Sequence, residues 1–197
     1  MLHNGIDAEE FRPPSRPPHR NPTRLICVAS LRPEKGVIRL VQLLPAILSR
    51  HSVELRIVGD GVERGEIEQA IRHLGLQSAV ILLGPQRLVA PFLNEADVYV
   101  SAAFVEGFGI AVAEAAASGM PAVVFAAPGG LSEVVVDGHT GFVISSSDEA
   151  AFVDAVVRLC RDPDLRNRMG LAARQHVIDN FSLPVVAGDL ERLFSSE

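Results

Sequence analysis

Several residue types that would point to particular protein classes are scarce in this 197-residue sequence. Tryptophan is absent and aromatic residues make up 5% of the chain, so stacking on aromatic rings is not expected to dominate ligand recognition. The formal net charge of -6 gives no basic excess, which a nucleic-acid surface would need. No apolar run approaches the ~20 residues of a membrane-spanning helix. The composition therefore argues against a nucleic-acid partner and against a membrane span.

Only two cysteines occur, Cys27 and Cys160, and both lie in apolar patterns. Buried, reduced thiols are expected at such positions, because disulfides are rare in cytosolic proteins. The start of the chain, "MLHNGIDAEEF", has neither the charged nor the apolar region of a signal peptide. The sequence thus predicts a cytoplasmic protein.

Residues 1–23 differ in composition from the rest of the chain. The stretch "FRPPSRPPHRNP" is dense in proline, which neither a helix interior nor a central strand tolerates. Such a segment is typical of an extended linker. Compact structure is therefore expected to start near Arg24.

From residue 24 onward, short apolar runs alternate with segments of helical period. The expected strands are residues 24–30, 53–59, 79–84, 97–101, 121–126 and 141–145. Continuous apolar strands separated by helices are typical of a parallel sheet that is covered on both faces. The sequence predicts one doubly wound, Rossmann-like α/β domain of about six strands over residues 24–181, and a C-terminal helix over 182–197. Ser147 is the expected N-cap of the helix after the last strand.

The loop "SLRPEKG" follows the first strand, at the edge of the sheet where ligands of such folds bind. Arg32 and Lys35 in this loop stand beside a helix start, where cations, unpaired amides and the helix dipole together favour an anion. Taken alone, the loop would also fit a solvated connection between a strand and a helix.

The stretch "IVGDGVERG" resembles a dinucleotide fingerprint, but its spacing is G-x-G-x-x-x-G and no acidic residue follows about twenty positions later. We therefore expect no nicotinamide or flavin. Asp60 and Gly61 would form a tight turn, Gly59 would let the backbone approach a ligand, and Arg64 would reach an anion.

The stretch "VEGFGIAVAEAAASGMP" carries Glu106 and Glu114, eight positions apart, around a glycine-flanked helix start. Gly107 and Gly109 leave backbone amides open there, which favours a phosphate group. Two carboxylates are good acceptors for pairs of hydroxyls. A ligand with hydroxyls at both ends and anions between them would fit, and ribose, diphosphate and sugar in a nucleotide sugar have that layout.

A further glycine turn, Gly129–Gly130, precedes a short helix, and its amides are expected to face the same ligand. The acids of "DPD" fit a helix start, with Asp162 as the N-cap, better than a metal site. The histidines show no ligand spacing. We therefore expect no bound metal.

Together these residues resemble the retaining GT-B glycosyltransferases of group 1, whose signature is E-x7-E. The resemblance rests on "EGFGIAVAEAAASGMP" and on "SLRPEKG", "LRIVGDGVER", "EADVYVSAAFVEGFG", "PGGLSEVVVDGHTGFVI" and "RNRMGLAARQHVIDNFS". It runs from about Asn4 to the end and covers the carboxyl-terminal half of a two-domain fold. It implies that residues 1–23 connect the two domains, and that the helix over 182–197 packs on an amino-terminal, acceptor-binding domain.

The resemblance also implies an activity, the transfer of a hexose-type sugar from a nucleoside diphosphate sugar with retention, and it implies no metal or other cofactor. Arg32, Lys35 and Glu106 would be the catalytic residues, the two cations at the diphosphate and Glu106 at the sugar hydroxyls. Glu114 would hold the ribose. The other donor-binding residues would be Gly59, Arg64, Gly84, Gly107, Phe108, Gly109, Gly129 and Gly130. Any membrane association would come through the amino-terminal domain.

Two alternatives remain open from the sequence. A non-catalytic nucleotide-sugar-binding module is favoured by the lack of the acceptor-binding half. A sugar-nucleotide epimerase of the same general fold would need both domains and its own acid and base, and the E-x7-E spacing favours transfer over that reaction.

Overall fold

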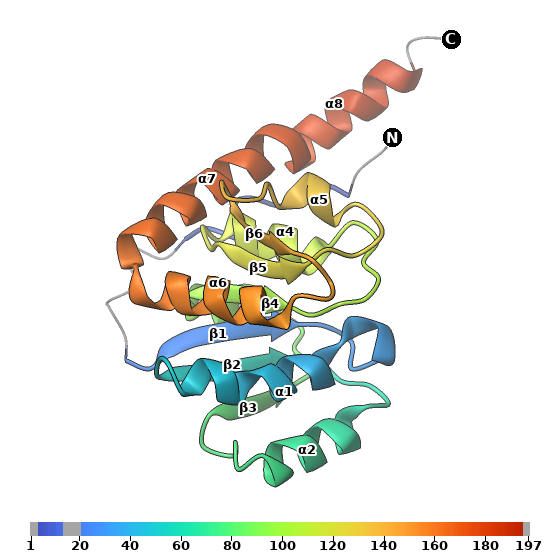
Figure 1. Ribbon diagram of the computed structural model, residues 1–197. Coiled ribbons are helices and arrows are strands. Elements are labelled where there is room, and N and C mark those ends of the chain that lie inside the picture. Colours follow the sequence, from blue (N-terminus) through green and yellow to red (C-terminus); the bar gives the residue numbers. More distant parts are fainter. Residues whose placement is uncertain (1–3, 14–20, 195–197) are drawn as a thin grey trace.

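A computed structural model describes residues 4–13 and 21–194, and its six strands form one parallel sheet in the order β3-β2-β1-β4-β5-β6 (Figure 1). The strands are β1 (Thr23–Val28), β2 (Val53–Val58), β3 (Val80–Gly84), β4 (Val98–Ser101), β5 (Ala122–Phe125) and β6 (Gly141–Ile144). The helices are α1 (Val37–Leu48), α2 (Arg64–His73), α3 (Ala90–Asn94), α4 (Ile110–Ala117), α5 (Leu131–Val134), α6 (Glu149–Arg161), α7 (Pro163–Phe181) and α8 (Leu183–Phe194). The predicted fold, six parallel strands with extra helices at the carboxyl end, is confirmed.

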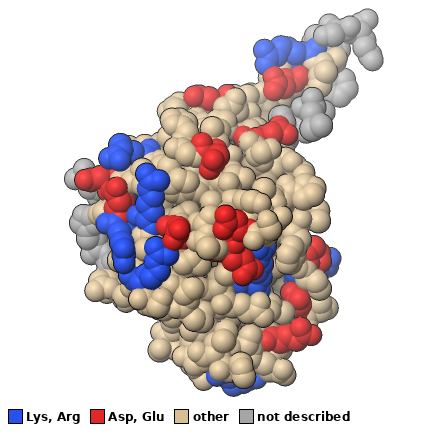
Figure 2. Space-filling model, in the orientation of Figure 1, with Lys and Arg blue, Asp and Glu red and all other residues tan. Residues whose placement is uncertain are grey.

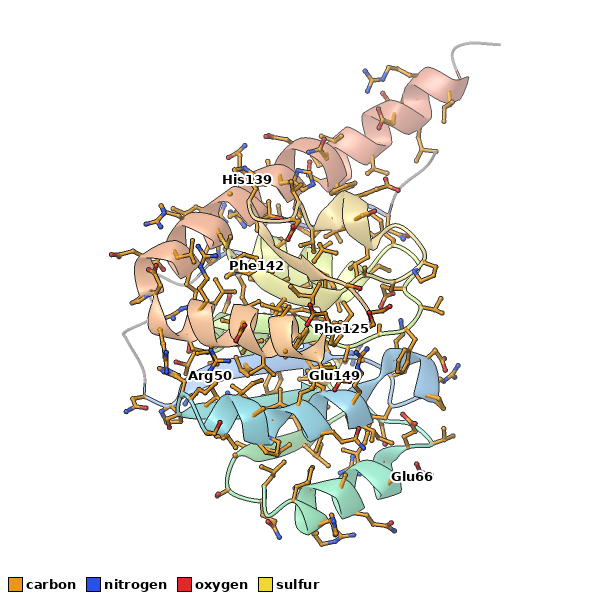
Figure 3. All side chains as sticks on the ribbon, in the orientation of Figure 1. Arg50, Glu66, Phe125, His139, Phe142 and Glu149 are labelled. Atoms are coloured by element: carbon orange, nitrogen blue, oxygen red, sulfur yellow. The ribbon has the colours of Figure 1, made fainter. Side chains whose placement is uncertain are left out.

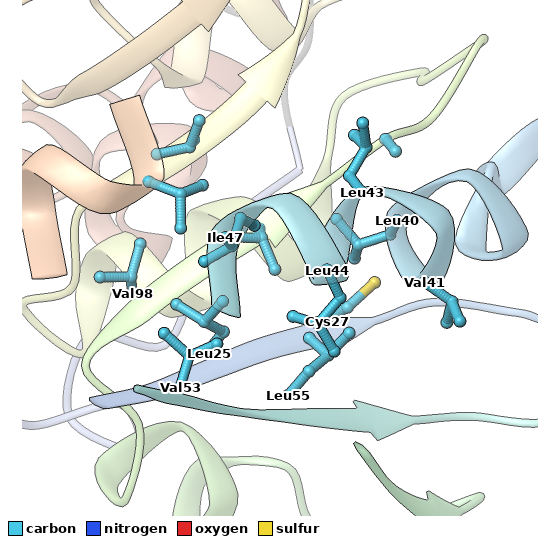
Figure 4. Close-up of a cluster of buried hydrophobic side chains, with 14 of the residues drawn as sticks. Leu25, Cys27, Leu40, Val41, Leu43, Leu44, Ile47, Val53, Leu55 and Val98 are labelled. Atoms are coloured by element: carbon cyan, nitrogen blue, oxygen red, sulfur yellow. The ribbon is translucent and has the colours of Figure 1, made fainter. Parts of the chain in front are cut away.

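Each face of the sheet has its own core, because successive side chains of a strand point to opposite faces. Leu25 and Cys27 enter the core that α1, α2 and α6 cover, whereas Ile26 enters the core beneath α4 and α7. Figure 4 shows α1 lying over β1 and β2 in the first core. Both cysteines are free and buried, as expected.

The expectation that compact structure starts near Arg24 is wrong, although the sheet itself begins at Thr23. Ile6 and Phe11 are only 3% and 6% exposed and belong to the core beneath α7. The guanidinium of Arg174 on α7 donates to backbone carbonyls of this first segment and of α4. Two apolar residues in a polar segment give no periodic signal, so the sequence could not reveal this packing. Residues 14–20 of the predicted linker lie outside the described residues.

The N-cap of α6 lies one residue later than expected. Asp148, not Ser147, caps it, and the Asp148 carboxylate accepts a hydrogen bond from Ala151 N at 2.9 Å. A carboxylate satisfies the unpaired amide and also matches the positive end of the helix dipole. The predicted cap of α7 is confirmed, since Asp162 accepts from Leu165 N at 2.8 Å.

Helix α8 extends beyond the body of the domain (Figure 1). Leu183 and Leu193 on this helix are 49% and 58% exposed. The predicted terminal helix therefore presents apolar side chains to solvent over its described part, while residues 195–197 lie outside it. None of the helices in the described part of the chain is long and apolar enough to cross a membrane.

Candidate functional site

A cavity of about 460 Å³ lies at the carboxyl ends of β1, β2 and β4. From β1 the chain builds outward through β2 and β3, and from β4 it builds the other way, so loops diverge between β1 and β4. Such a switch point is where doubly wound sheets bind ligands. The lining residues are Asn4, Val28, Ala29, Ser30, Lys35, Val58, Gly59, Pro85, Gln86, Val89, Tyr99, Ser101, Glu106, Phe108, Gly109, Ile110, Ala111 and Glu114.

Lys35 and Glu106 form an ion pair in this cavity, with Nζ and Oε2 2.8 Å apart. Lys35 is the only lysine of the sequence. Both side chains are mostly buried, at 24% and 19% exposure, so the pair is less screened by solvent than a surface pair. The cavity therefore holds one cation and one anion side by side. A negatively charged ligand group can replace Glu106 at Lys35, and hydrogen-bond donors of a ligand can replace Lys35 at Glu106.

Glu114 lies on α4 and lines the same cavity. Burial among small apolar residues raises the pKa of its carboxyl from 4.5 to about 7, and the negative charge of Glu10 adds to the rise. The cause is desolvation, because a low-polarity environment disfavours the ionised form. The carboxyl consequently changes its charge near neutral pH, at the wall of the cavity.

The start of α4 is built from a glycine in the left-handed conformation. Gly109 is the N-cap, with φ at 83°, and no side-chain hydrogen bond caps this end of the helix. A residue with a Cβ would be strained there. Gly109 and Phe108 line the cavity, whereas Gly107 does not, so the site includes only part of the predicted cradle at the helix start.

The Gly129–Gly130 turn supports the Glu106 loop from behind. Gly130 N donates to Gly107 O, and Glu106 N donates to Pro128 O at 3.2 Å. A Cβ at Gly129 would lie 1.7 Å from Glu106 O, so only glycine allows this approach. The sequence led us to expect that the Gly130 amide faces a ligand. In the structure this amide donates its hydrogen bond to Gly107 O instead.

The loops after β1 and β2 are also joined by their backbones. Leu31 N donates to Asp60 O at 2.9 Å, and Glu63 N donates to Leu31 O at 3.0 Å. A Cβ at Gly59 would lie 1.9 Å from Ala29 O, which explains the glycine at this lining position. Gly84 does not line the cavity, but its carbonyl oxygen accepts a hydrogen bond from Gly59 N at 2.9 Å and so helps to position Gly59.

Two predicted cations stand outside the lining. Arg32 is exposed at the start of the 3-10 helix Pro33–Lys35. Arg64 is directed along α2, where its Nε lies 3.1 Å from Glu68 and its guanidinium 3.7 Å from Asp60. Lys35 is the predicted cation that the structure brings into the cavity.

Two polar lining residues, Asn4 and Tyr99, were missed from the sequence. Tyr99, the single tyrosine, is 2% exposed and its hydroxyl donates to Val28 O at 3.1 Å. Burial raises its pKa well above the ordinary value, so the ring stays neutral. Its alternation in β4 was the available signal, since it places Tyr99 on the face opposite to Val98 and Val100.

Within residues 4–13 and 21–194, no three His, Cys, Asp or Glu side chains gather closely enough to hold a metal ion.

The sequence matches the family described as Glycosyl transferases group 1 over residues 7–176. The chain belongs to this family.

Two curated relatives illustrate the range of the family. The chain is 31% identical over 170 residues to the N-acetyl-alpha-D-glucosaminyl L-malate synthase of Bacillus anthracis, covering 86% of this chain and 44% of that protein. It is 35% identical over 191 residues to the glycogen synthase of Mycobacterium tuberculosis, covering 95% of this chain and 46% of that protein. The chain thus spans about half the length of the curated relatives it matches.

Solved structures show the same fold. S. aureus TarM in complex with UDP, among other ligands, superposes with a TM-score of 0.91 at 22% identity, covering 98% of this chain and 39% of TarM. Anabaena HepE in complex with UDP and glucose gives a TM-score of 0.87 at 22% identity, covering 100% of this chain and 56% of HepE. The C-terminal domain of a Francisella tularensis group 1 glycosyl transferase gives 0.78 at 20% identity, covering 91% of this chain and 100% of that domain. These neighbours are GT-B glycosyltransferases, and the chain has the fold of their carboxyl-terminal type of domain.

Proposed function

We propose that this chain binds a nucleoside diphosphate sugar and serves as the donor-binding half of a retaining glycosyltransferase. The observation that carries the proposal is the single cavity at the switch point of the sheet, which Lys35, Glu106 and Glu114 line together with the start of α4. A cation and open helix amides suit the diphosphate, and the carboxylates suit the hydroxyl groups on either side of it.

The Lys35–Glu106 pair suggests how the site would act during transfer. Binding of the donor would give Lys35 a phosphate and Glu106 the hydroxyls of the sugar, replacing the 2.8 Å contact between them. Departure of the diphosphate creates negative charge, which Lys35 and the amides at the start of α4 would stabilise. Arg32, which is exposed in the same loop, remains a proposed second contact to the diphosphate.

Calorimetric titration with UDP, GDP and their glucose and mannose conjugates tests the proposal, with uridine and guanosine as phosphate-free references. Lys35→Ala and Arg32→Ala are each expected to weaken diphosphate binding by about 10-fold to 100-fold, since a charge-assisted bond contributes about 1.5–3 kcal/mol. Nucleoside binding should be nearly unchanged. Arg72→Ala, at the exposed end of α2, is the matched control and should alter neither.

The two carboxylates separate the two ends of the ligand. Glu114→Gln is expected to weaken binding with or without the sugar, whereas Glu106→Gln should spare the free diphosphate and weaken only the sugar-bearing donor. Equal losses of UDP or GDP affinity in both variants would contradict the proposed orientation.

A non-catalytic nucleotide-sugar-binding module is the second candidate. The two proposals share the binding site and differ in turnover.

A further inference from the structure

A second hollow, of about 440 Å³, lies at the opposite edge of the sheet, where β1 and β2 begin and α6 ends. Among the described residues its lining is Asn21, Thr23, His51, Ser52, Cys160, Arg161, Pro163 and Arg166, with two guanidinium groups, an imidazole and two hydroxyls but no carboxylate. Figure 2 shows Arg side chains, with Asp and Glu side chains among them, at the left edge of the view, near the ends of α1 and α6. Arg50, labelled in Figure 3, marks the end of α1 there.

Both guanidinium groups of the hollow are anchored by the backbone. Arg166 Nη1 donates to the carbonyls of Leu159 at 2.7 Å and Cys160 at 3.2 Å. Arg161 Nη2 donates to Arg50 O at 2.7 Å. A guanidinium carries five N–H donors, so one engaged nitrogen in each still leaves donors for an oxyanion. The anchoring also reduces the side-chain entropy that binding would otherwise cost.

The acids of the surrounding elements are engaged elsewhere or stand apart from the lining. Asp154 on α6 pairs with Arg50, and Asp162 caps α7 through Leu165 N. Asp97, before β4, accepts from Arg24 N at 2.8 Å. Asp164 lies in the first turn of α7, is exposed, and is not part of the lining. The described lining itself therefore carries two guanidinium groups and no carboxylate.

The imidazole of His51 is influenced by the charges of these two guanidinium groups. Its Nε2 lies 3.0 Å from the hydroxyl oxygen of buried Thr23, which fixes the ring at the wall. Burial lowers the pKa of the imidazole, and the charges of Arg161 and Arg166 lower it further. A bound anion would offset the two guanidinium charges and so favour protonation of the ring.

We propose that this basic hollow, lined by His51, Arg161 and Arg166, is a binding site for a phosphate group, separate from the nucleotide-sugar cavity. Two guanidinium forks and hydroxyl donors match the several oxygens of a phosphate better than a single carboxylate. Strand β1 runs from the hollow at Thr23 to the cavity at Val28, so the two sites are roughly 17 Å apart along six residues of strand. The phosphate belongs either to a small phosphorylated molecule or to a phospholipid headgroup.

Imidazole NMR of His51, assigned with a His51→Gln variant, tests the site directly with inorganic phosphate at low ionic strength. Phosphate is expected to move the His51 resonances saturably and to raise the pKa of the ring. The same titration on a Lys35→Gln background should give the same result, since that variant removes the cation of the nucleotide-sugar cavity.

Charge-matched variants localise the effect. Arg161→Gln is expected to weaken phosphate binding about tenfold, the loss of one charge-assisted contact. Arg168→Gln removes the same charge from an exposed position of α7 outside the lining and should leave affinity unchanged. Arg166→Gln should act like Arg161→Gln, with its thermal transition recorded because Arg166 also holds the end of α6.

Vesicles separate the two sources of the phosphate. Co-sedimentation with phosphatidylglycerol vesicles, but not with phosphatidylcholine vesicles, that Arg161→Gln weakens and Arg168→Gln does not would assign a headgroup. Binding of inorganic phosphate without vesicle binding would assign a small molecule. Unperturbed His51 resonances at 10 mM phosphate together with no vesicle binding, or equal losses in Arg161→Gln and Arg168→Gln, would overturn the proposal.

Discussion

Glu114 is a residue whose environment opposes its own charge. The carboxyl is partly buried on α4, and its pKa rises from 4.5 to about 7 because of that burial and the charge of Glu10. Ionisation therefore costs more in the folded chain than in the unfolded chain. Between about pH 4.5 and pH 7 the folded state binds the extra proton, so this residue makes stability fall as the pH rises through that range.

Glu114→Gln should remove this pH dependence. We expect the variant to be about 1–2 kcal/mol more stable than the parent chain at pH 8, a value reduced for the screening of a partly exposed group. Below pH 4.5 the difference should vanish, because the parent carboxyl is then neutral in both states. Urea denaturation at pH 4.5 and pH 8 measures both values. Glu66→Gln, an exposed acid on α2, is the control, and a Glu114→Gln variant that is destabilised at pH 8 would contradict the assignment.

At the scale of elements, the loops after β4 and β5 act as one unit. The Gly129 position permits an approach to Glu106 O that no Cβ would fit, since the contact would be 1.7 Å. Gly129 also has φ at 125°, which side chains other than glycine rarely adopt. The position of the Glu106 backbone therefore depends on a residue in another loop.

Gly129→Ala should displace the Glu106 loop. We expect a loss of about 1–3 kcal/mol in stability, the range for backbone strain of this kind, and a clear loss of affinity for the sugar-bearing donor. Thermal denaturation and calorimetry measure the two effects. Gly65→Ala on α2 is the matched control, because nothing lies within 4 Å of its added Cβ, and it should be neutral or slightly stabilising. Equal behaviour of the two variants would show that the approach is not restrictive.

The sequence predicted the elements with strong periodicity and missed those set by tertiary contact. Six apolar strands and the cap at Asp162 were accessible, because hydrophobic period and helix-start chemistry are local signals. The burial of Ile6 and Phe11 was not, because it depends on α7, more than 150 residues later. The ion pair between Lys35 and Glu106 could not be predicted from the sequence either. The two residues are 71 positions apart, and each was assigned to a separate part of a ligand. The roles of these site residues remain predictions.

At the scale of the whole molecule, the proposed function assigns this chain one side of a donor site that a second domain would close. We expect the purified chain to bind a nucleotide but not to transfer sugar, because positioning of two reactants can contribute about 7–11 kcal/mol to barrier lowering. Calorimetry should detect UDP or GDP, while a mass-spectrometric product assay stays at background. Addition of an acceptor-binding domain, in cis or in trans, should restore transfer. Robust transfer by the 197-residue chain without any partner would refute this expectation.

The backbone contact between Ile6 and the junction of α7 and α8 has a mechanical meaning. Ile6 N donates to Phe181 O at 2.8 Å, Leu183 N donates to Ile6 O at 3.0 Å, and Arg174 holds the residues that follow Ile6. A domain joined to the chain before Ile6, or one joined after α8, would connect to this domain next to these hydrogen bonds. Domains joined at the two ends would thus be attached at the same place on this domain, beside the junction of α7 and α8.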